Sequence, residues 1–413
     1  MGYLTKIAFK NLARHRLRTV VSIAAIAFSV LVVVFARGYV LGLAESAVTD
    51  HIFYDSGHIK ILHPEYLEQA RLLPLNLPVD DLSNLVDAFQ KVEGVELVVP
   101  RIKFGAMIST GDELFTPAGW GVDPELELAF TDIAHHLAEG RMPRLGQLEI
   151  AVGSELAKNI GREVGEKVTI AYTTAFNSLG GATFTIVGLL ESGMKLLNEH
   201  VFFLPLDEAQ RLLYLDNQAT ELLLITTDLK SVSSMLPKVQ NLLSKQAGDY
   251  TALSYRDTSD LIPFTDLAKL IYNQVYVFLV LLAAVVVINT MLMIVKERTQ
   301  EIGMMAALGL EGKDIVGLFV IEGGIMGAAG SLAGAVLGLV LTKHFGRVGI
   351  DYTQALSGMS KDIVLNAVIR PVVSLENAVF AFVLGTIIVT FACVFPARKA
   401  ASLEPSEAMR SVQ

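Results

Sequence analysis

Few residues of this chain have the types and spacing that catalysis requires. Gly312-Lys313 is its only Gly-Lys pair, yet Asp314 follows where a phosphate-binding loop needs Ser or Thr, and Ala307 stands at the position of the loop's first glycine. The sequence also contains neither a Gly-x-Ser-x-Gly nucleophile elbow nor a His-Glu-x-x-His metal motif. We therefore expect no catalytic residue here, and no nucleotide or other cofactor bound by this chain.

Two groups of histidines raise the question of a metal site: His51, His58 and His63, and the adjacent His135 and His136. Their spacing matches none of the zinc-ligand patterns. The simpler interpretation is that they are surface histidines beside a strand. We predict no metal site.

Glu322 is the one acidic residue well inside an apolar run, residues 315–342. A charge in a membrane is costly, so a proton relay or another functional role has to be considered. Glu322 is about two turns from the end of its run, however, where it can reach the interface or a basic partner. We favour structural pairing and keep ion transport as the alternative.

The elements that position these residues are mostly apolar. The chain is 52% hydrophobic with a mean hydropathy of +0.51, and residues 19–36, 270–295 and 378–395 carry no charge at all. Together with residues 315–342, each run has the ~18–20 apolar residues that a helix needs to cross about 30 Å of hydrocarbon. The sequence predicts four transmembrane helices.

Charge predicts the orientation. Residues 44–268 contain 32 Asp and Glu against 16 Lys and Arg, which argues against nucleic-acid binding. Five basic residues and no acidic one precede the first apolar run: Lys6, Lys10, Arg14, Arg16 and Arg18. By the positive-inside rule we expect both termini in the cytoplasm and residues 44–268 outside. A cleaved signal peptide is the alternative, but its apolar region would be shorter than this one.

Cys393, the only cysteine, lies in the fourth run, so no disulfide forms within the chain.

The first residues have an amphipathic helical pattern. Leu4, Ile7, Ala8 and Leu12 share one face, and Lys6, Lys10, Arg14 and Arg18 recur on another. This pattern is typical of a helix in the membrane interface, with its basic stripe towards anionic headgroups. The alternative is a cytoplasmic extension of the first span.

The large polar region reads as α+β. We predict strand 59–62, helix 82–91 and strand 95–100, then a second unit of strand 221–226, helix 232–245 and strand 250–255. These units flank a glycine-rich, strand-like middle, residues 104–204, so a two-lobed domain is predicted with the middle inserted into the first lobe.

In the third span, glycines recur at helical spacing at Gly323, Gly327, Gly330, Gly334 and Gly338. Such a smooth face lets another helix approach closely, which indicates packing rather than chemistry.

Several segments resemble the MacB/FtsX superfamily of ABC permeases. Residues 296–309 read KERTQEIGMMAALG, and members carry E-R-T-x-E-I-G between their second and third spans. Residues 10–19, KNLARHRLRT, and 396–410, PARKAASLEPSEAMR, resemble the family's first and last span boundaries. EIAVGSELA at 149–157, GEKV at 165–168, FTIVG at 184–188 and LPLDEAQ at 204–210 resemble its periplasmic core. Many members have arginine where Ala306 stands, so an ion pair made there is absent or supplied elsewhere.

The resemblance implies a dimer of permeases, identical or paralogous, above two separate ABC ATPase subunits that bind ATP and Mg. We read residues 296–308 as a short helix ended by Gly309, and the resemblance makes it the coupling helix. Its candidate contacts to the ATPase are Glu297, Arg298, Glu301, Ile302, Gly303, Met304 and Met305. Ile302, Met305 and Ala306 are expected to form an apolar ridge, and Glu297 and Glu301 an acidic edge.

The unfused layout and GHIKI at 57–61 look most like the lipoprotein-releasing LolC/LolE-type branch. Extraction of lipoproteins or another amphiphile from the bacterial inner membrane is therefore the leading expectation. Export of drugs or peptides, and non-transporting signalling to a cell-wall hydrolase, are the alternatives. The predicted order is amphipathic helix 1–18, span 19–43, periplasmic domain 44–266, span 267–295, coupling loop 296–314, span 315–342, outer loop 343–377, span 378–396 and cytoplasmic tail 397–413.

Overall fold

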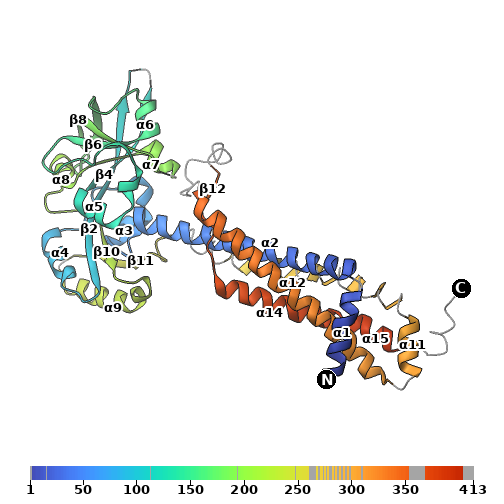
Figure 1. The fold of residues 1–413 in the computed structure, drawn as a ribbon. Helices are drawn as coiled ribbons and strands as arrows, with labels where there is room; N and C mark the ends of the chain where they lie inside the picture. Colours follow the sequence, from blue (N-terminus) through green and yellow to red (C-terminus); the bar gives the residue numbers. More distant parts are fainter. Residues whose placement is uncertain are drawn as a thin grey trace. The chain divides into compact units, whose positions relative to one another are not determined.

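The computed structural model describes residues 2–14, 16–111, 113–192, 194–246, 248–259, 299–307, 310–352 and 368–402, with scattered positions between 267 and 296. The chain divides into two compact units (Figure 1). We call Met1–Ala44, Phe264–Ile350 and Ile369–Gln413 the helical unit, and Glu45–Pro263 with Asp351–Val368 the sheet unit.

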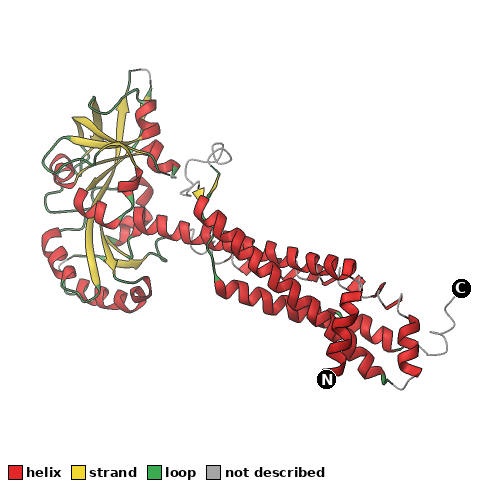
Figure 2. Ribbon diagram, viewed as in Figure 1, coloured by secondary structure: helices red, strands yellow, loops and turns green. Residues whose placement is uncertain are grey.

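The named elements of the helical unit are almost all helices (Figure 2). They are α1 Gly2–Arg14, most of α2 Arg16–His51, α11 Thr299–Ala307, α12 Gly312–Val348, α14 Leu375–Ala392 and α15 Val394–Ala401. Among the residues that the structure describes, three candidate spans are long and apolar enough to cross a membrane: Thr19–Ser56, Gly312–Val348 and Leu375–Lys399. They correspond to three of the predicted spans. The other predicted span, 267–295, is described only at scattered positions.

The helices run past the predicted span limits. α12 has 37 residues, about 55 Å at 1.5 Å per residue, because its polar ends continue the helix beyond 315–342. The last predicted span, 378–396, is divided into α14 and α15 at Cys393. Pro396 explains the break, since its ring clashes with the carbonyl of Ala392, four residues earlier.

The sheet unit contains an eleven-stranded sheet whose main path is β11-β1-β10-β2-β4-β9-β6-β8-β5. Its strands are β1 Ile59–Leu62, β2 Val95–Ser109, β3 Leu114–Phe115, β4 Ala118–Val122, β5 Leu137–Gly140, β6 Glu149–Gly153, β7 Lys167–Thr173, β8 Leu179–Leu190, β9 Val201–Pro205, β10 Glu221–Thr226 and β11 Thr251–Ser254. The helices are α3 Pro64–Glu68, α4 Leu82–Gln90, α5 Pro124–Phe130, α6 Ser154–Asn159, α7 Lys195–His200, α8 Leu206–Leu213 and α9 Val232–Leu243. The two remaining named strands, β12 Ile350–Asp351 and β13 Val368–Ile369, pair with each other in a separate two-stranded sheet.

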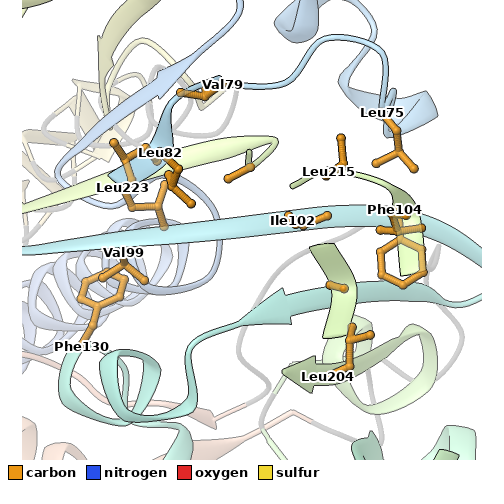
Figure 3. Packing of buried hydrophobic residues seen from close by; sticks show 14 of the residues in the cluster. Leu75, Val79, Leu82, Val99, Ile102, Phe104, Phe130, Leu204, Leu215 and Leu223 are labelled. Carbon is orange, nitrogen blue, oxygen red and sulfur yellow. The ribbon is translucent and has the colours of Figure 1, made fainter. Parts of the chain in front are cut away.

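β2 joins the two predicted lobes. Its first half pairs with β10, which pairs with β1, so strands of the two flanking units lie side by side. Its second half continues past residue 100 to pair with β4 and β7 of the glycine-rich middle. Figure 3 shows Val99, Ile102 and Phe104 of β2 in one apolar cluster with Leu223 and Leu204. One strand and one core therefore serve both lobes.

Candidate functional site

The predicted coupling helix is α11, and it belongs to a group of helices at one end of the helical unit. α11 and α12 both contact α15, and α1 contacts α12 (Figure 1). We call α11, with the residues of α1, α12 and α15 packed around it, the candidate coupling site. Glu297 and Arg298 lie outside the described residues, and of Met305 only the backbone is described.

Ile302 fixes α11 in place. Its side chain is 1% exposed and belongs to the same apolar cluster as Ile315, Phe319 and Ala397, which come from α12 and α15. Ile302 therefore faces inward, towards α12 and α15. Gly303 is also buried. Within this cluster, burial of one isoleucine stabilises the position of α11 by roughly 1.5–3 kcal/mol.

The exposed edge of α11 consists of different residues. Met304 is 53% exposed, and the Glu301 side chain is 38% exposed. A flexible thioether beside a carboxylate gives this edge both an adaptable apolar contact and a charge. Gln300 of α11 is exposed as well, so a partner protein can reach all three of these side chains.

α1 packs against this site on its apolar face. Ala8 is fully buried and Leu12 contacts the helical core, while Lys6 and Lys10 are exposed. α1 ends at Arg14 and α2 begins at Arg16, and the Thr19 hydroxyl donates to the Leu12 carbonyl across this junction at 3.1 Å. α1 is therefore a separate helix rather than an extension of the first span.

Two polar contacts link α1 to the site. Arg14 Nη1 lies 3.3 Å from Glu301 Oε1, but the Arg14 side chain is 72% exposed, so this pair adds little to stability. The second contact is buried: Asn11 Nδ2 donates to Glu322 Oε1 at 2.7 Å, and Glu322 is 2% exposed. The structure thus gives Glu322 a hydrogen-bond partner within the chain. Asn11 was not singled out from the sequence, because no local pattern joins residues 311 positions apart.

The glycines of α12 contact two different neighbours. A Cβ at Gly323 or Gly327 would meet Cys393 or Val389, at the junction of α14 and α15. A Cβ at Gly330, Gly334 or Gly338 would meet α2 instead, at Ile26, Ala27 and Val34 respectively. At Gly334 the nearest atom is the Ala27 carbonyl oxygen, only 2.3 Å away. These glycines therefore allow close backbone approach on two sides of α12.

The histidines hold local structure in the sheet unit. His51 forms a hydrogen bond with the Thr258 hydroxyl, and His58 forms one with the Thr226 hydroxyl. The His63 ring accepts a hydrogen bond from the Glu65 backbone amide at the start of α3. Among the described residues, no group of three or more His, Cys, Asp or Glu side chains has a metal-binding arrangement.

Comparison with known families decides the assignment. The MacB-like periplasmic core domain matches residues 19–244, more than half of the chain, and the FtsX-like permease C-terminal domain matches residues 273–405. The chain belongs to the MacB/FtsX family of ABC transporter permeases. The predicted family is therefore confirmed, and with it a protein of membrane helices plus an α+β domain.

Relatives of this permease extend over most of its length. An uncharacterized ABC transporter permease of Methanocaldococcus jannaschii is 24% identical over 98% of this chain and 96% of its own. The lipoprotein-releasing system transmembrane protein LolC of Neisseria meningitidis serogroup B is 23% identical over 80% of this chain and 81% of its own. Among solved structures, the extracellular domain of the YknZ transporter aligns with 48% of this chain and 99% of that chain, at 14% identity and a TM-score of 0.36.

Proposed function

We propose that this permease transmits the ATP-driven movement of a separate ABC ATPase to its sheet unit, and so lifts lipoproteins or another amphiphile out of the membrane. The observation that carries the proposal is the arrangement of α11, which is anchored through Ile302 while Met304 and Glu301 remain reachable. An anchored helix with an exposed edge can move its neighbours when a partner pushes on it. ATP and Mg bind to the ATPase, of which two copies serve a pair of permeases.

In this proposal α11 and both termini are in the cytoplasm, and the sheet unit is on the outer side of the inner membrane. The basic cluster of α1 and the acidic balance of residues 44–268 support this orientation. The exposed Lys6 and Lys10 of α1 then face anionic headgroups or the cytosol.

An amphiphilic substrate fits the composition of the spans. Within residues 19–36, 315–342 and 378–395, Glu322 is the one acidic side chain, and it is buried against Asn11. A pore for polar solutes would be lined by polar and ionisable groups. A lipid-anchored substrate needs no such pore, since its acyl chains leave the outer leaflet sideways. The LolC relatives, whose name refers to lipoprotein release, support this substrate class.

Export of drugs or peptides is the second candidate, and the match to a MacB-like core favours it. Depletion of the chain in its host separates the candidates. Lipoproteins retained in the inner membrane support lipoprotein release. Drug sensitivity with normal lipoprotein sorting supports export. Chaining cells with normal sorting would instead indicate signalling to a cell-wall hydrolase.

The coupling role is tested by Glu301→Arg in the complex of this permease with its copurified ATPase. We expect ATP hydrolysis to continue while ATP-dependent release of a triacylated lipopeptide from proteoliposomes falls about tenfold, the factor of one lost charged hydrogen bond. Arg14→Gln, which removes only the Arg14–Glu301 pair, is the control and should release lipopeptide normally.

The double variant Arg14→Glu, Glu301→Arg restores that pair with its charges exchanged. Release should remain low in the double variant if Glu301 contacts the ATPase. If the double variant regains release, the role of Glu301 is its ion pair with Arg14 and not a contact with the ATPase. If Glu301→Arg alone releases lipopeptide like the wild type, α11 is not the coupling element.

A further inference from the structure

The outer end of α2 has an unusual form. α2 continues beyond the predicted span limit of residue 43 to His51, and η1, a π-helix over Ile52–Ser56, follows it. π-helical turns are rare and often occur at functional positions. Gly57, with φ of 59°, then turns the chain into β1, and a Cβ there would meet Leu223 of β10 at 2.9 Å. The chain thus passes from α2 into the sheet through one wide helical turn. All residues considered below belong to the sheet unit.

Two cations of β2 hold the backbone of η1. Arg101 Nη2 donates to the Phe53 carbonyl at 2.8 Å, and Lys103 Nζ donates to the Tyr54 carbonyl at 3.4 Å. Carbonyls at the end of a helix carry partial negative charge, so cations bind there favourably. These two bonds are accepted by main-chain carbonyls of η1. They therefore hold η1 against β2 whichever side chains η1 carries.

The side chain of Asp55 adds a second attachment. Its Oδ1 lies 3.2 Å from Lys60 Nζ and 3.0 Å from Lys103 Nζ. Glu221 of β10 contacts the same two lysines at 2.8 and 3.0 Å. Lys60, Lys103 and Glu221 are all less than 10% exposed, whereas the Asp55 side chain is 43% exposed. Two acids and two bases thus connect η1 with β1, β2 and β10.

Arg101 joins this network to α5. Its guanidinium binds Glu127 through two hydrogen bonds, 3.1 Å from Nε and 2.6 Å from Nη2, and both side chains are fully buried. The Phe53 ring meets Phe130 edge to face, with centroids 5.5 Å apart. The Tyr54 hydroxyl donates to Asp132 at 2.6 Å. Consecutive residues of η1 therefore contact different elements of the sheet unit.

Their neighbours favour the charged forms of Lys60 and Glu221. Burial lowers the pKa of Lys60, but the charges of Asp55 and Glu221 more than offset it and hold the pKa above its usual 10.5. Burial likewise raises the pKa of Glu221, yet Lys103 and Lys60 bring it below its usual 4.5. A buried network of this kind adds little stability compared with apolar packing of the same volume, because desolvation of the charges is costly. What such a network can supply is one defined geometry.

We propose that Asp55, Lys60, Arg101, Lys103, Glu127 and Glu221, the α2–sheet junction, form a positioning device that makes the sheet follow the outer end of α2. The proposal rests on the proposed function in one respect: α2 must carry movement for the junction to transmit it. Without the junction, the wide turn of η1 and Gly57 would allow α2 to move while the sheet stays in place.

Asp55 is the residue to change, because its partly exposed side chain can lose a charge without leaving a buried cavity. We expect Asp55→Asn to fold and to weaken the junction, while Asp55→Glu keeps the carboxylate and behaves like the wild type. The control is Glu155→Gln, which breaks the exposed 2.6 Å pair of Glu155 and Lys158 on α6. Spin labels at Glu45 of α2 and Glu96 of β2, both exposed, report the distance across the junction in the full-length complex.

The distance distribution should be narrow in the wild type, Asp55→Glu and Glu155→Gln, and broad in Asp55→Asn. ATP hydrolysis should continue in Asp55→Asn, while ATP-dependent release of a triacylated lipopeptide falls about tenfold, the factor that a hydrogen bond to a charged group supplies. A narrow distribution in folded Asp55→Asn, or release equal to wild type, would overturn the proposal. If Asp55→Asn does not fold, broadening in Lys60→Met decides in its place.

Failure of the two proposals can be told apart. A wild-type complex that releases no lipopeptide contradicts the proposed function, and the spin-label distances still test the junction. A wild-type complex that releases lipopeptide, together with an equally active Asp55→Asn variant, contradicts the junction alone.

Discussion

Glu322 is the residue on which structural and transport interpretations differ most. Its buried carboxylate accepts a hydrogen bond from Asn11, so its contact within the chain links α12 to α1. Glu322→Gln keeps an oxygen that can accept this bond, and we expect lipopeptide release to remain within about twofold of wild type, since a neutral pair retains most of the hydrogen bond. Asn11→Leu removes the donor and should destabilise the helical unit by about 1–3 kcal/mol.

Cys393 provides the measurement for these variants. It is the only cysteine and is fully buried, so a thiol-reactive fluorophore reports unfolding of the helical unit. Asn11→Leu should lower the temperature at which Cys393 reacts, and Glu322→Gln should not. Loss of release in Glu322→Gln without any change in that temperature would favour a proton relay instead.

Acid should weaken the sheet unit through Glu221. Lys103 and Lys60 hold its pKa below 4.5 in the folded protein, although burial alone would raise it. Its contribution to stability is therefore complete above pH 4.5 and is lost as the pH falls through the lower folded-state pKa. Burial raises the pKa of Glu127, so its protonation stabilises the fold as the pH falls towards 4.5, above the range in which Glu221 loses its charge.

Comparison with Glu221→Gln isolates the part due to Glu221. Trp120 is the only tryptophan and its ring lies 4.7 Å from Lys103 Nζ, so its fluorescence reports unfolding near the junction. As the pH is lowered below 4.5, the urea concentration at the unfolding midpoint should decrease more steeply in the wild type than in Glu221→Gln. Parallel acid profiles for the two proteins would contradict the assignment.

The packing of α12 is a property of the helix face rather than of any single side chain. Gly334→Ala places a Cβ 2.3 Å from the Ala27 carbonyl oxygen, so α2 and α12 must separate. We expect a loss of about 1–3 kcal/mol, typical of overpacking. Gly324→Ala on the same helix is the matched control: its nearest neighbour is Thr390 Oγ1 at 3.5 Å, an ordinary contact. That variant should be slightly stabilised, because alanine favours helix by about 1 kcal/mol over glycine.

Cys393 reactivity measures both glycine variants. A lower unfolding temperature for Gly334→Ala and an equal or higher one for Gly324→Ala are expected. Equal destabilisation of both would mean that flexibility of α12, and not the close approach to α2, is what the glycines supply.

Local sequence patterns predicted many of these elements. Strand 59–62 coincides with β1, and helix 82–91 differs from α4 by one residue, because alternation and helical periodicity are visible within a few residues. β2 is longer than its predicted six residues because its second half is stabilised by pairing with β4 and β7, which are distant in sequence. The inward orientation of Ile302 and the Asn11–Glu322 bond likewise depend on tertiary contacts. The sequence therefore located the candidate coupling helix, but it did not predict which face of that helix is exposed.

Considered as a whole, the chain combines an acidic sheet unit with a basic and apolar helical unit. Residues 44–268 have twice as many acidic as basic side chains, 32 against 16, whereas the residues before the first span are purely basic. Basic segments resist translocation, so the two ends of α2 should face opposite sides of the membrane. This asymmetry makes the topology testable with one cysteine at a time in a Cys393→Ser background.

Asn159→Cys places a thiol at the exposed last residue of α6 in the sheet unit, and Lys313→Cys places one at the exposed start of α12, where the lysine side chain is 75% exposed. In intact spheroplasts, a membrane-impermeant maleimide should label Asn159→Cys at once and Lys313→Cys only after lysis. The two variants control for each other, because leaky cells would label both and an inaccessible thiol would label in neither condition. Labelling of Lys313→Cys alone before lysis would place α11 outside the cell, where no ATPase could drive it, and the coupling mechanism would fail with the topology.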